Sequence, residues 1–114
     1  MSDFPILDPQ QVAAATAQPG LVLLDFWQAT CAPCRALEPR LAELAHQHPG
    51  TFDGYRIDVD ADPRTVDAFD VMSIPTVVLL RDGHEVARLD GLIRPEDLHA
   101  MIADATSPGD ADAG

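Results

Sequence analysis

Seven consecutive residues place the strongest limit on how this chain can fold: Leu21-Val22-Leu23-Leu24-Asp25-Phe26-Trp27, which follow Pro19-Gly20. All of them except Asp25 are apolar, and the run is continuous rather than alternating. A continuous apolar run of this length is typical of a strand that is covered on both faces. Such strands occur in α/β proteins, so we expect an α/β fold with helices on both faces of a central sheet.

The rest of the chain alternates between helix and strand patterns. Helices are predicted for 8–15, 34–48, 62–69 and 95–105, and further strands for 4–7, 52–59, 76–80 and 85–89. Pro39 lies inside the second of these helices and should kink it. Asp82-Gly83 is typical of a hairpin turn between the last two strands. This order predicts one mixed sheet, parallel in its centre, that ends in an antiparallel hairpin.

Length and charge narrow the range of partners. The chain has 114 residues, about one domain, with 7 basic and 19 acidic residues and a net charge of −12. This charge repels phosphate groups, so neither nucleic acid nor an anionic membrane is an expected partner. Residues 1–105 are predicted to form the domain, and the small and acidic residues 106–114 a disordered tail. The chain shows no signal peptide and no apolar run long enough to cross a bilayer, so we expect a cytoplasmic protein.

The two cysteines, Cys31 and Cys34, are three positions apart, and a bridge between them would restrict the unfolded chain little. A disulfide between them would therefore have a role in a redox reaction and not in stabilising the fold. They follow a predicted strand and open a predicted helix, where free backbone N–H groups and the helix dipole stabilise a thiolate. We expect Cys31 to be the nucleophile of a disulfide exchange and Cys34, one turn inside the helix, to be the more buried resolving thiol. Ala32-Pro33 supplies no imidazolium to stabilise the thiolate further, which favours a reducing couple over a strong oxidant.

A zinc site is the alternative for the same cysteines, because His46 and His48 follow them much as in a zinc finger. The spacing of the two histidines is shorter than in such sites. In addition, Cys34 and His46 lie twelve residues apart on one predicted helix, a separation of about 18 Å. We therefore disfavour zinc and expect the histidines to lie at a solvated helix end.

Asp25 is a carboxylate within a predicted buried strand, where an ionised acid is costly. Desolvation should raise its pKa and bring it into the range in which it can exchange a proton with Cys34. The alternative is a carboxylate that reaches solvent at the end of the strand.

The segment Leu24-Asp25-Phe26-Trp27-Gln28-Ala29-Thr30-Cys31-Ala32-Pro33-Cys34-Arg35 resembles the active-site segment of the thioredoxin family. Further matches follow at the spacing of the family: Pro39, Ser73-Ile74-Pro75-Thr76, Asp82-Gly83 and Gly91. The resemblance covers about 6–105, nearly the whole predicted domain, and it implies a thioredoxin fold.

The resemblance also implies roles for single residues. Asp25 matches the buried acid of the family, and Pro75 matches its cis-proline, which places the backbone of Ile74 where an extended peptide can pair with it. Without the resemblance, a trans bond would be expected before Pro75, because cis bonds are a small minority of X–Pro bonds. Trp27 is interpreted as a packing wall beside the cysteines, and Gly91 as the close-approach glycine of the substrate groove.

Several positions depart from the family pattern, and these departures affect the docking surface or the reduction potential. Thr30 stands where tryptophan is usual, and Ala32, beside Pro33 on the docking surface, replaces a common glycine. Met72 occupies a groove position that is often basic. Arg56 falls where the family commonly has a lysine near the buried acid, and its fixed charge should temper the rise in the pKa of Asp25. Arg35 is the base next to the cysteines in the sequence.

The implied function is a cytoplasmic protein-disulfide reductase that cycles Cys31 and Cys34 between dithiol and disulfide, with proton transfer at Asp25. The resemblance further implies a monomer without a bound cofactor, which reduces disulfide-containing client proteins and is itself reduced by an NADPH-dependent flavoprotein, thioredoxin reductase. Two alternatives remain open: a disulfide oxidase or isomerase of the same fold, and a binding module whose cysteines are incidental.

Overall fold

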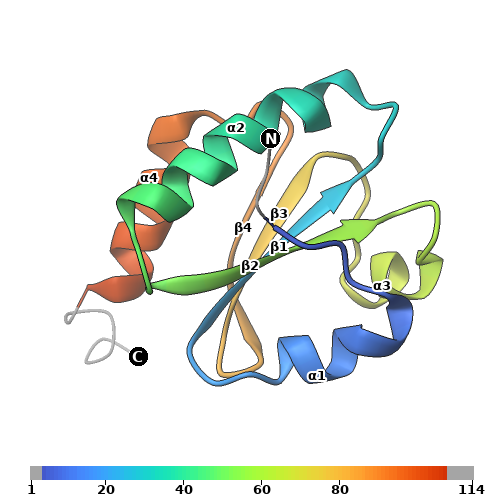
Figure 1. The fold of residues 1–114 in the computed structure, drawn as a ribbon, viewed down its shortest axis with the longest axis horizontal. Coiled ribbons are helices and arrows are strands. Elements are labelled where there is room, and N and C mark those ends of the chain that lie inside the picture. Colours follow the sequence, from blue (N-terminus) through green and yellow to red (C-terminus); the bar gives the residue numbers. More distant parts are fainter. Residues whose placement is uncertain (1–3, 108–114) are drawn as a thin grey trace.

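A four-stranded sheet runs through the molecule, with helices on both of its faces (Figure 1). The computed structural model describes residues 4–107. Its strands are β1 (Leu21–Trp27), β2 (Phe52–Asp58), β3 (Thr76–Arg81) and β4 (His84–Asp90). Its helices are a 3-10 turn (Pro9–Gln11), α1 (Val12–Thr16), α2 (Ala32–Gln47), α3 (Pro63–Ala68) and α4 (Pro95–Thr106). The predicted α/β architecture is therefore confirmed.

The order of the strands is β2-β1-β3-β4, and it corrects one expectation about their directions. β1 and β2 are parallel, but the two central strands, β1 and β3, are antiparallel, as are β3 and β4. The centre of the sheet is thus not parallel. The apolar pattern could not show this, because a strand covered on both faces has the same continuous run of apolar residues in either direction.

The predicted first strand is also reduced in the structure. Residues 4–7 make one parallel bridge, between Ile6 and Arg56, instead of a strand. Two backbone hydrogen bonds hold this segment against β2: the N–H of Leu7 donates to the carbonyl of Arg56, and the N–H of Arg56 donates to the carbonyl of Pro5. Pro5 has no N–H of its own, so it cannot extend the ladder.

Two hydrophobic cores lie on the two faces of the sheet, and β1 contributes to both. Leu23 faces α2 and α4, where it packs with residues that include Leu41 and Ile102. Leu24 and Phe26 face the opposite way and belong to the core that also includes Leu7, Ala15, Val71 and Ile57. The five inner residues of β1 are fully buried, as a strand covered on both faces requires. Figure 1 shows α2 and α4 together on one face and α1 and α3 on the other.

The last helix extends one residue beyond the predicted boundary between the domain and the tail. α4 includes Thr106, the first residue of the predicted tail, because its hydroxyl and backbone continue the helix. Residues 108–114 of that tail lie outside the described part of the chain. Among the helices of residues 4–107, none combines the length and the apolar character that a membrane crossing needs.

Candidate active site

Cys31 and Cys34 form a disulfide at the start of α2, directly after the loop that follows β1. Their Cα atoms are 5.2 Å apart. Cys31 is the N-cap of the helix, and its Sγ accepts a hydrogen bond from the backbone N–H of Cys34 at 3.2 Å. Cys31 is partly exposed, whereas Cys34 is completely buried. One sulfur can thus meet a substrate and the other can be reached only from inside the site.

Asp25 lies on β1 with its side chain toward the face that α2 covers, as the alternation from Leu23 requires. It is fully buried, and neither carboxylate oxygen has a hydrogen-bond partner among residues 4–107. Burial is the main cause that raises the pKa of Asp25 to about 7, while the charge of Arg56 opposes this rise and that of Glu38 adds to it. The alternative of a solvent-exposed carboxylate is therefore wrong, and the acid titrates close to neutral pH.

Arg56 is the direct neighbour of Asp25 in the parallel register of β1 and β2. Its guanidinium forms an ion pair of 2.7 Å with Glu38 of α2 and lies 4.8 Å from the centre of the Trp27 ring. Trp27 itself is half-buried, and its indole N–H has no partner in the described chain. Sequence reasoning missed Glu38. The signal for it was present, since Glu38 follows Cys34 by four positions and so lies on the same side of the helix.

The Ile74–Pro75 bond is cis, as the resemblance implies. Pro75 is buried, and the next residue, Thr76, begins β3 with its hydroxyl donating to the carbonyl of Ser73. Gly91 follows the end of β4 and has φ +71°, in the left-handed region that favours glycine. The cis bond and this glycine belong to loops at the ends of β3 and β4, which pair with one another in the sheet.

A groove of roughly 360 Å³ joins these loops to α2, and it is lined by Pro33, Ala36, Leu37, Arg40, Ile74, Pro75, Gly91, Leu92 and Ile93. Four of the predicted site residues, Pro33, Ile74, Pro75 and Gly91, are thus brought together. Arg40 fixes one wall, because its guanidinium donates to the carbonyl of Ile93 at 2.7 Å.

Two large apolar side chains in the loops that precede β3 and follow β4 are exposed, and of these Leu92 lines the groove whereas Met72 does not. Leu92 is 79% exposed, and Met72 is 92% exposed. Thr30, Ala32 and Arg35, which are close to Cys31 in the sequence, are exposed. Leu92 and Arg40 were missed as site residues, because their place in the groove depends on how α2 packs against the loop before α4.

The histidines of the zinc alternative are not gathered around the cysteines. His46 is exposed near the far end of α2, and His48 instead contacts His99 of α4, with 3.0 Å between their ring nitrogens. No three His, Cys, Asp or Glu side chains within residues 4–107 come together in a way that could hold a metal ion.

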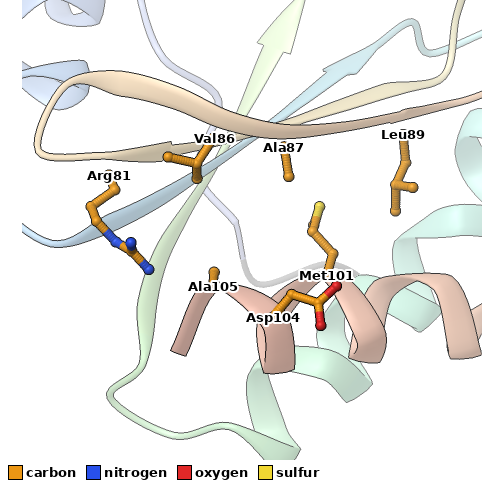
Figure 2. Close-up of a pocket in the computed structure, with 7 residues that line it drawn as sticks. All are labelled: Arg81, Val86, Ala87, Leu89, Met101, Asp104 and Ala105. Carbon is orange, nitrogen blue, oxygen red and sulfur yellow. The ribbon is translucent and has the colours of Figure 1, made fainter. Parts of the chain in front are cut away.

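A second cavity lies between β4 and α4, and Figure 2 shows its walls. Its lining is mostly apolar, with Arg81 and Asp104 as the charged members of a set that also includes Val86, Ala87, Leu89, Met101 and Ala105. None of the predicted site residues lines it. The groove, in contrast, is lined by Pro33, which lies between the two cysteines.

Comparisons with known proteins agree with this site. The sequence model of the thioredoxin family matches residues 7–104. A thioredoxin of Staphylococcus haemolyticus is 42% identical over 85 residues, which span 75% of this chain and 82% of that protein. A thioredoxin of Alicyclobacillus acidocaldarius is 42% identical over 83 residues, 73% of this chain and 79% of that protein. A solved structure of a mutant thioredoxin from Halobacterium salinarum superposes with a TM-score of 0.81 at 31% identity, covering 91% of this chain and 90% of that one. The chain therefore belongs to the thioredoxin family and is a thioredoxin-type protein-disulfide reductase.

Proposed function

We propose that Cys31 is the attacking sulfur, that Cys34 resolves the intermediate and that Asp25 accepts the proton of Cys34. The observation that carries this assignment is the unequal exposure of the two bonded sulfurs: Cys31 is reachable from solvent, and Cys34 is completely buried on the helix that covers Asp25. A substrate can therefore bond to the first sulfur and must be displaced by the second.

The first step uses the position of Cys31 at the N-terminus of α2. Its Sγ accepts the backbone N–H of Cys34, and the same donor and the helix dipole would stabilise a thiolate there. The thiolate attacks one sulfur of a substrate disulfide. The substrate S–S bond breaks as the mixed disulfide forms, and the departing substrate thiolate takes a proton from solvent.

The second step releases the substrate and uses the buried acid. The Cys34 thiol gives its proton to the Asp25 carboxylate, and its sulfur attacks Cys31 within the mixed disulfide. The second substrate sulfur leaves as a thiolate, so two electrons have passed to the substrate and Cys31–Cys34 is the disulfide seen in the structure. A base with a pKa of about 7 suits this transfer, since it is partly ionised at neutral pH and still holds a proton well.

Substrate docking is assigned to the groove between α2 and the loops before β3 and after β4. The backbone of Ile74, placed by the cis bond to Pro75, would pair with an extended substrate segment, while Pro33 and Gly91 form the adjoining walls. Thr30 and Ala32, on either side of Cys31 in the sequence, are exposed and would contact the substrate, and Trp27 packs against the guanidinium of Arg56.

We further infer the partners of the cycle. The two sulfurs and the carboxylate supply all the groups that the exchange needs, and each chain holds a complete set, so the protein acts as a monomer without a bound cofactor. A flavoprotein reductase that uses NADPH would return the disulfide to the dithiol in the cytoplasm. Disulfide-containing proteins are the clients, and Arg35, next to Cys34 in the sequence, gives them a cation on a chain with a net charge of −12.

Trapping of the intermediate tests the two cysteine roles. Cys34→Ser should accumulate mixed disulfides with a disulfide-bonded test protein, because nothing resolves the first adduct. Cys31→Ser should accumulate none, because its remaining sulfur is buried. Equal trapping by both variants, or trapping by Cys31→Ser alone, would contradict the assignment, and an equal absence of adducts would favour the binding module with incidental cysteines.

A further inference from the structure

The guanidinium of Arg56 forms no hydrogen bond with Asp25, the acid next to it in the sheet, and contacts other groups instead. Asp25 and Arg56 are register partners on adjacent parallel strands, so both side chains project toward α2. Both oxygens of Asp25 nevertheless lack a hydrogen-bond partner within residues 4–107. A buried carboxylate beside a guanidinium would ordinarily form a charge-assisted pair with it.

Three contacts account for where the guanidinium lies instead. Its Nε donates to the backbone carbonyl of Phe4 at 2.9 Å, and one terminal nitrogen donates to the carboxylate of Glu38 at 2.7 Å. Its flat face covers Trp27, with 4.8 Å to the ring centre. Glu38 is the anion among these partners, and the side chains of the pair are 19% and 17% exposed.

Glu38 stands one helical turn after Cys34 and on the same side of α2. Its carboxylate lies at the partly wet edge of the site, where an ion pair costs less desolvation than at Asp25. Glu38 is thus the better partner for Arg56, and Asp25 is left without a hydrogen-bond partner among residues 4–107.

We propose that Glu38 is a positioning residue for the resolving step: it holds Arg56 over Trp27 and thereby keeps the carboxylate of Asp25 available to take the proton of Cys34. The proposal rests on the role given to Asp25 in the proposed function, and it adds the ion pair that keeps Arg56 away from the carboxylate of Asp25.

The charges that face Asp25 give the direction of the effect. They are Arg56 from β2 and Glu38 from α2, beside the uncharged Cys34 on the same helix. Arg56 lowers the pKa of Asp25, and Glu38 raises it by direct repulsion. Removing the charge of Glu38 therefore acts twice in one direction, because the repulsion is lost and the cation is released toward Asp25.

The titration of Asp25 can be followed directly by ¹³C NMR of its carboxyl group in the oxidised protein. Wild type should titrate with a midpoint near 7. In Glu38→Gln the midpoint should fall by roughly one pH unit, the scale of the effect of one neighbouring charge. Glu38→Ala should move it in the same direction, and this second variant also removes any hydrogen bond that a glutamine amide could keep with Arg56.

Glu43→Gln is the matched control. It removes the same charge from the same helix, but Glu43 is exposed and accepts a hydrogen bond from Gln47 instead of pairing with Arg56. The Asp25 midpoint should stay at the wild-type value in this control. An unchanged or higher midpoint in Glu38→Gln and Glu38→Ala would overturn the role of Glu38 and leave that of Asp25 in place.

The rate of the resolving step separates positioning from mere support of the fold. Release of thiol from a preformed mixed disulfide is measured against pH in wild type, Glu38→Gln, Asp25→Asn and the double variant. Glu38→Gln should shift the pH profile to lower pH and, above pH 7, slow release several-fold, because a weaker base accepts the proton. In the Asp25→Asn background the same change should alter the rate less than twofold.

Two results of this comparison would count against the inference in different ways. An equal loss from Glu38→Gln with and without Asp25 would show that Glu38 does not act through the acid, which overturns the proposal alone. A wild-type rate and pH profile in Asp25→Asn would remove the acid from the resolving step, which overturns the proposed function of Asp25 and the proposal with it.

Discussion

The backbone N–H of Cys34 donates to the sulfur of Cys31 across 3.2 Å, because Cys31 occupies the N-cap position of α2. The helix thus offers a donor to one sulfur of the pair while it buries the other. A thiolate formed at Cys31 would receive this hydrogen bond and the field of the helix N-terminus. The asymmetry between the two sulfurs follows from a single turn of helix.

In the reduced protein, this asymmetry should appear as unequal alkylation. Iodoacetamide at pH 7 should modify Cys31 at least tenfold faster than Cys34, since the first sulfur is accessible and stabilised as a thiolate. Peptide mapping by mass spectrometry after short reaction times measures the ratio. Comparable rates at both cysteines would contradict the assigned asymmetry.

The buried acid should make the oxidised protein less stable at high pH. Folding raises the pKa of Asp25 from 3.8 to about 7, so the folded state holds the proton more tightly than the unfolded state. The stability that this proton supplies is present in full below about pH 4 and is lost as the pH rises through 7. The loss is on the order of 2–4 kcal/mol.

Urea unfolding of the oxidised wild type and of Asp25→Asn, each from pH 4 to pH 9, measures this loss. The free energy of unfolding of wild type should fall relative to that of the variant as the pH rises, because asparagine does not titrate. The comparison cancels the effect of the histidines. A constant difference between the two proteins over this pH range would show that Asp25 is not desolvated in the folded state.

Gly54 should be intolerant of even a methyl group. A Cβ at this position of β2 would lie 2.5–2.6 Å from three ring atoms of Phe4, which is buried and also stacks edge-to-face on Phe52. The ring would have to move, and Gly54→Ala should cost about 1–3 kcal/mol of unfolding free energy.

Chemical denaturation tests this cost, with Asp53→Ala as the control at an exposed neighbouring position of the same strand. The control should stay within about 0.5 kcal/mol of wild type. If Gly54→Ala were as stable as its control, Phe4 would not be held against β2 as the structure shows.

The reduction potential separates a reductase from an oxidase or isomerase of the same fold. Ala32 and Pro33 bring no charge between the cysteines, so the thiolate of the reduced form has little stabilisation beyond the helix N-terminus. Equilibration with glutathione buffers should therefore give a potential below about −200 mV. A potential well above this value would favour the oxidase or isomerase.

Much of the fold was predictable because its signals are local. The continuous apolar run of β1 predicted a strand buried on both faces, and the structure has both cores there. The direction of β3 relative to β1 was not predictable from apolar patterning. The strand predicted over 4–7 is a single bridge between Ile6 and Arg56, because Pro5 leaves the ladder without a donor.

In the site, too, residues with local sequence signals were predictable, and residues that meet only through packing were not. Cys31, Cys34 and Asp25 lie within ten residues of one another, and their unusual placement next to an apolar strand marks them. Glu38 and Arg56 meet only when α2 packs over β2, and Leu92 reaches the groove only through the loop before α4. The cis bond before Pro75 was predicted from the family resemblance, because an Ile-Pro pair taken alone favours the trans form.

The central claim is that the chain reduces protein disulfides through Cys31. The initial rate at which dithiothreitol reduces insulin disulfides, with and without catalytic amounts of the protein, tests it most directly. Wild type should accelerate this reduction many-fold, and Cys31→Ser should leave it at the uncatalysed rate, because the remaining cysteine is buried. A wild-type rate no higher than that of Cys31→Ser would contradict the account.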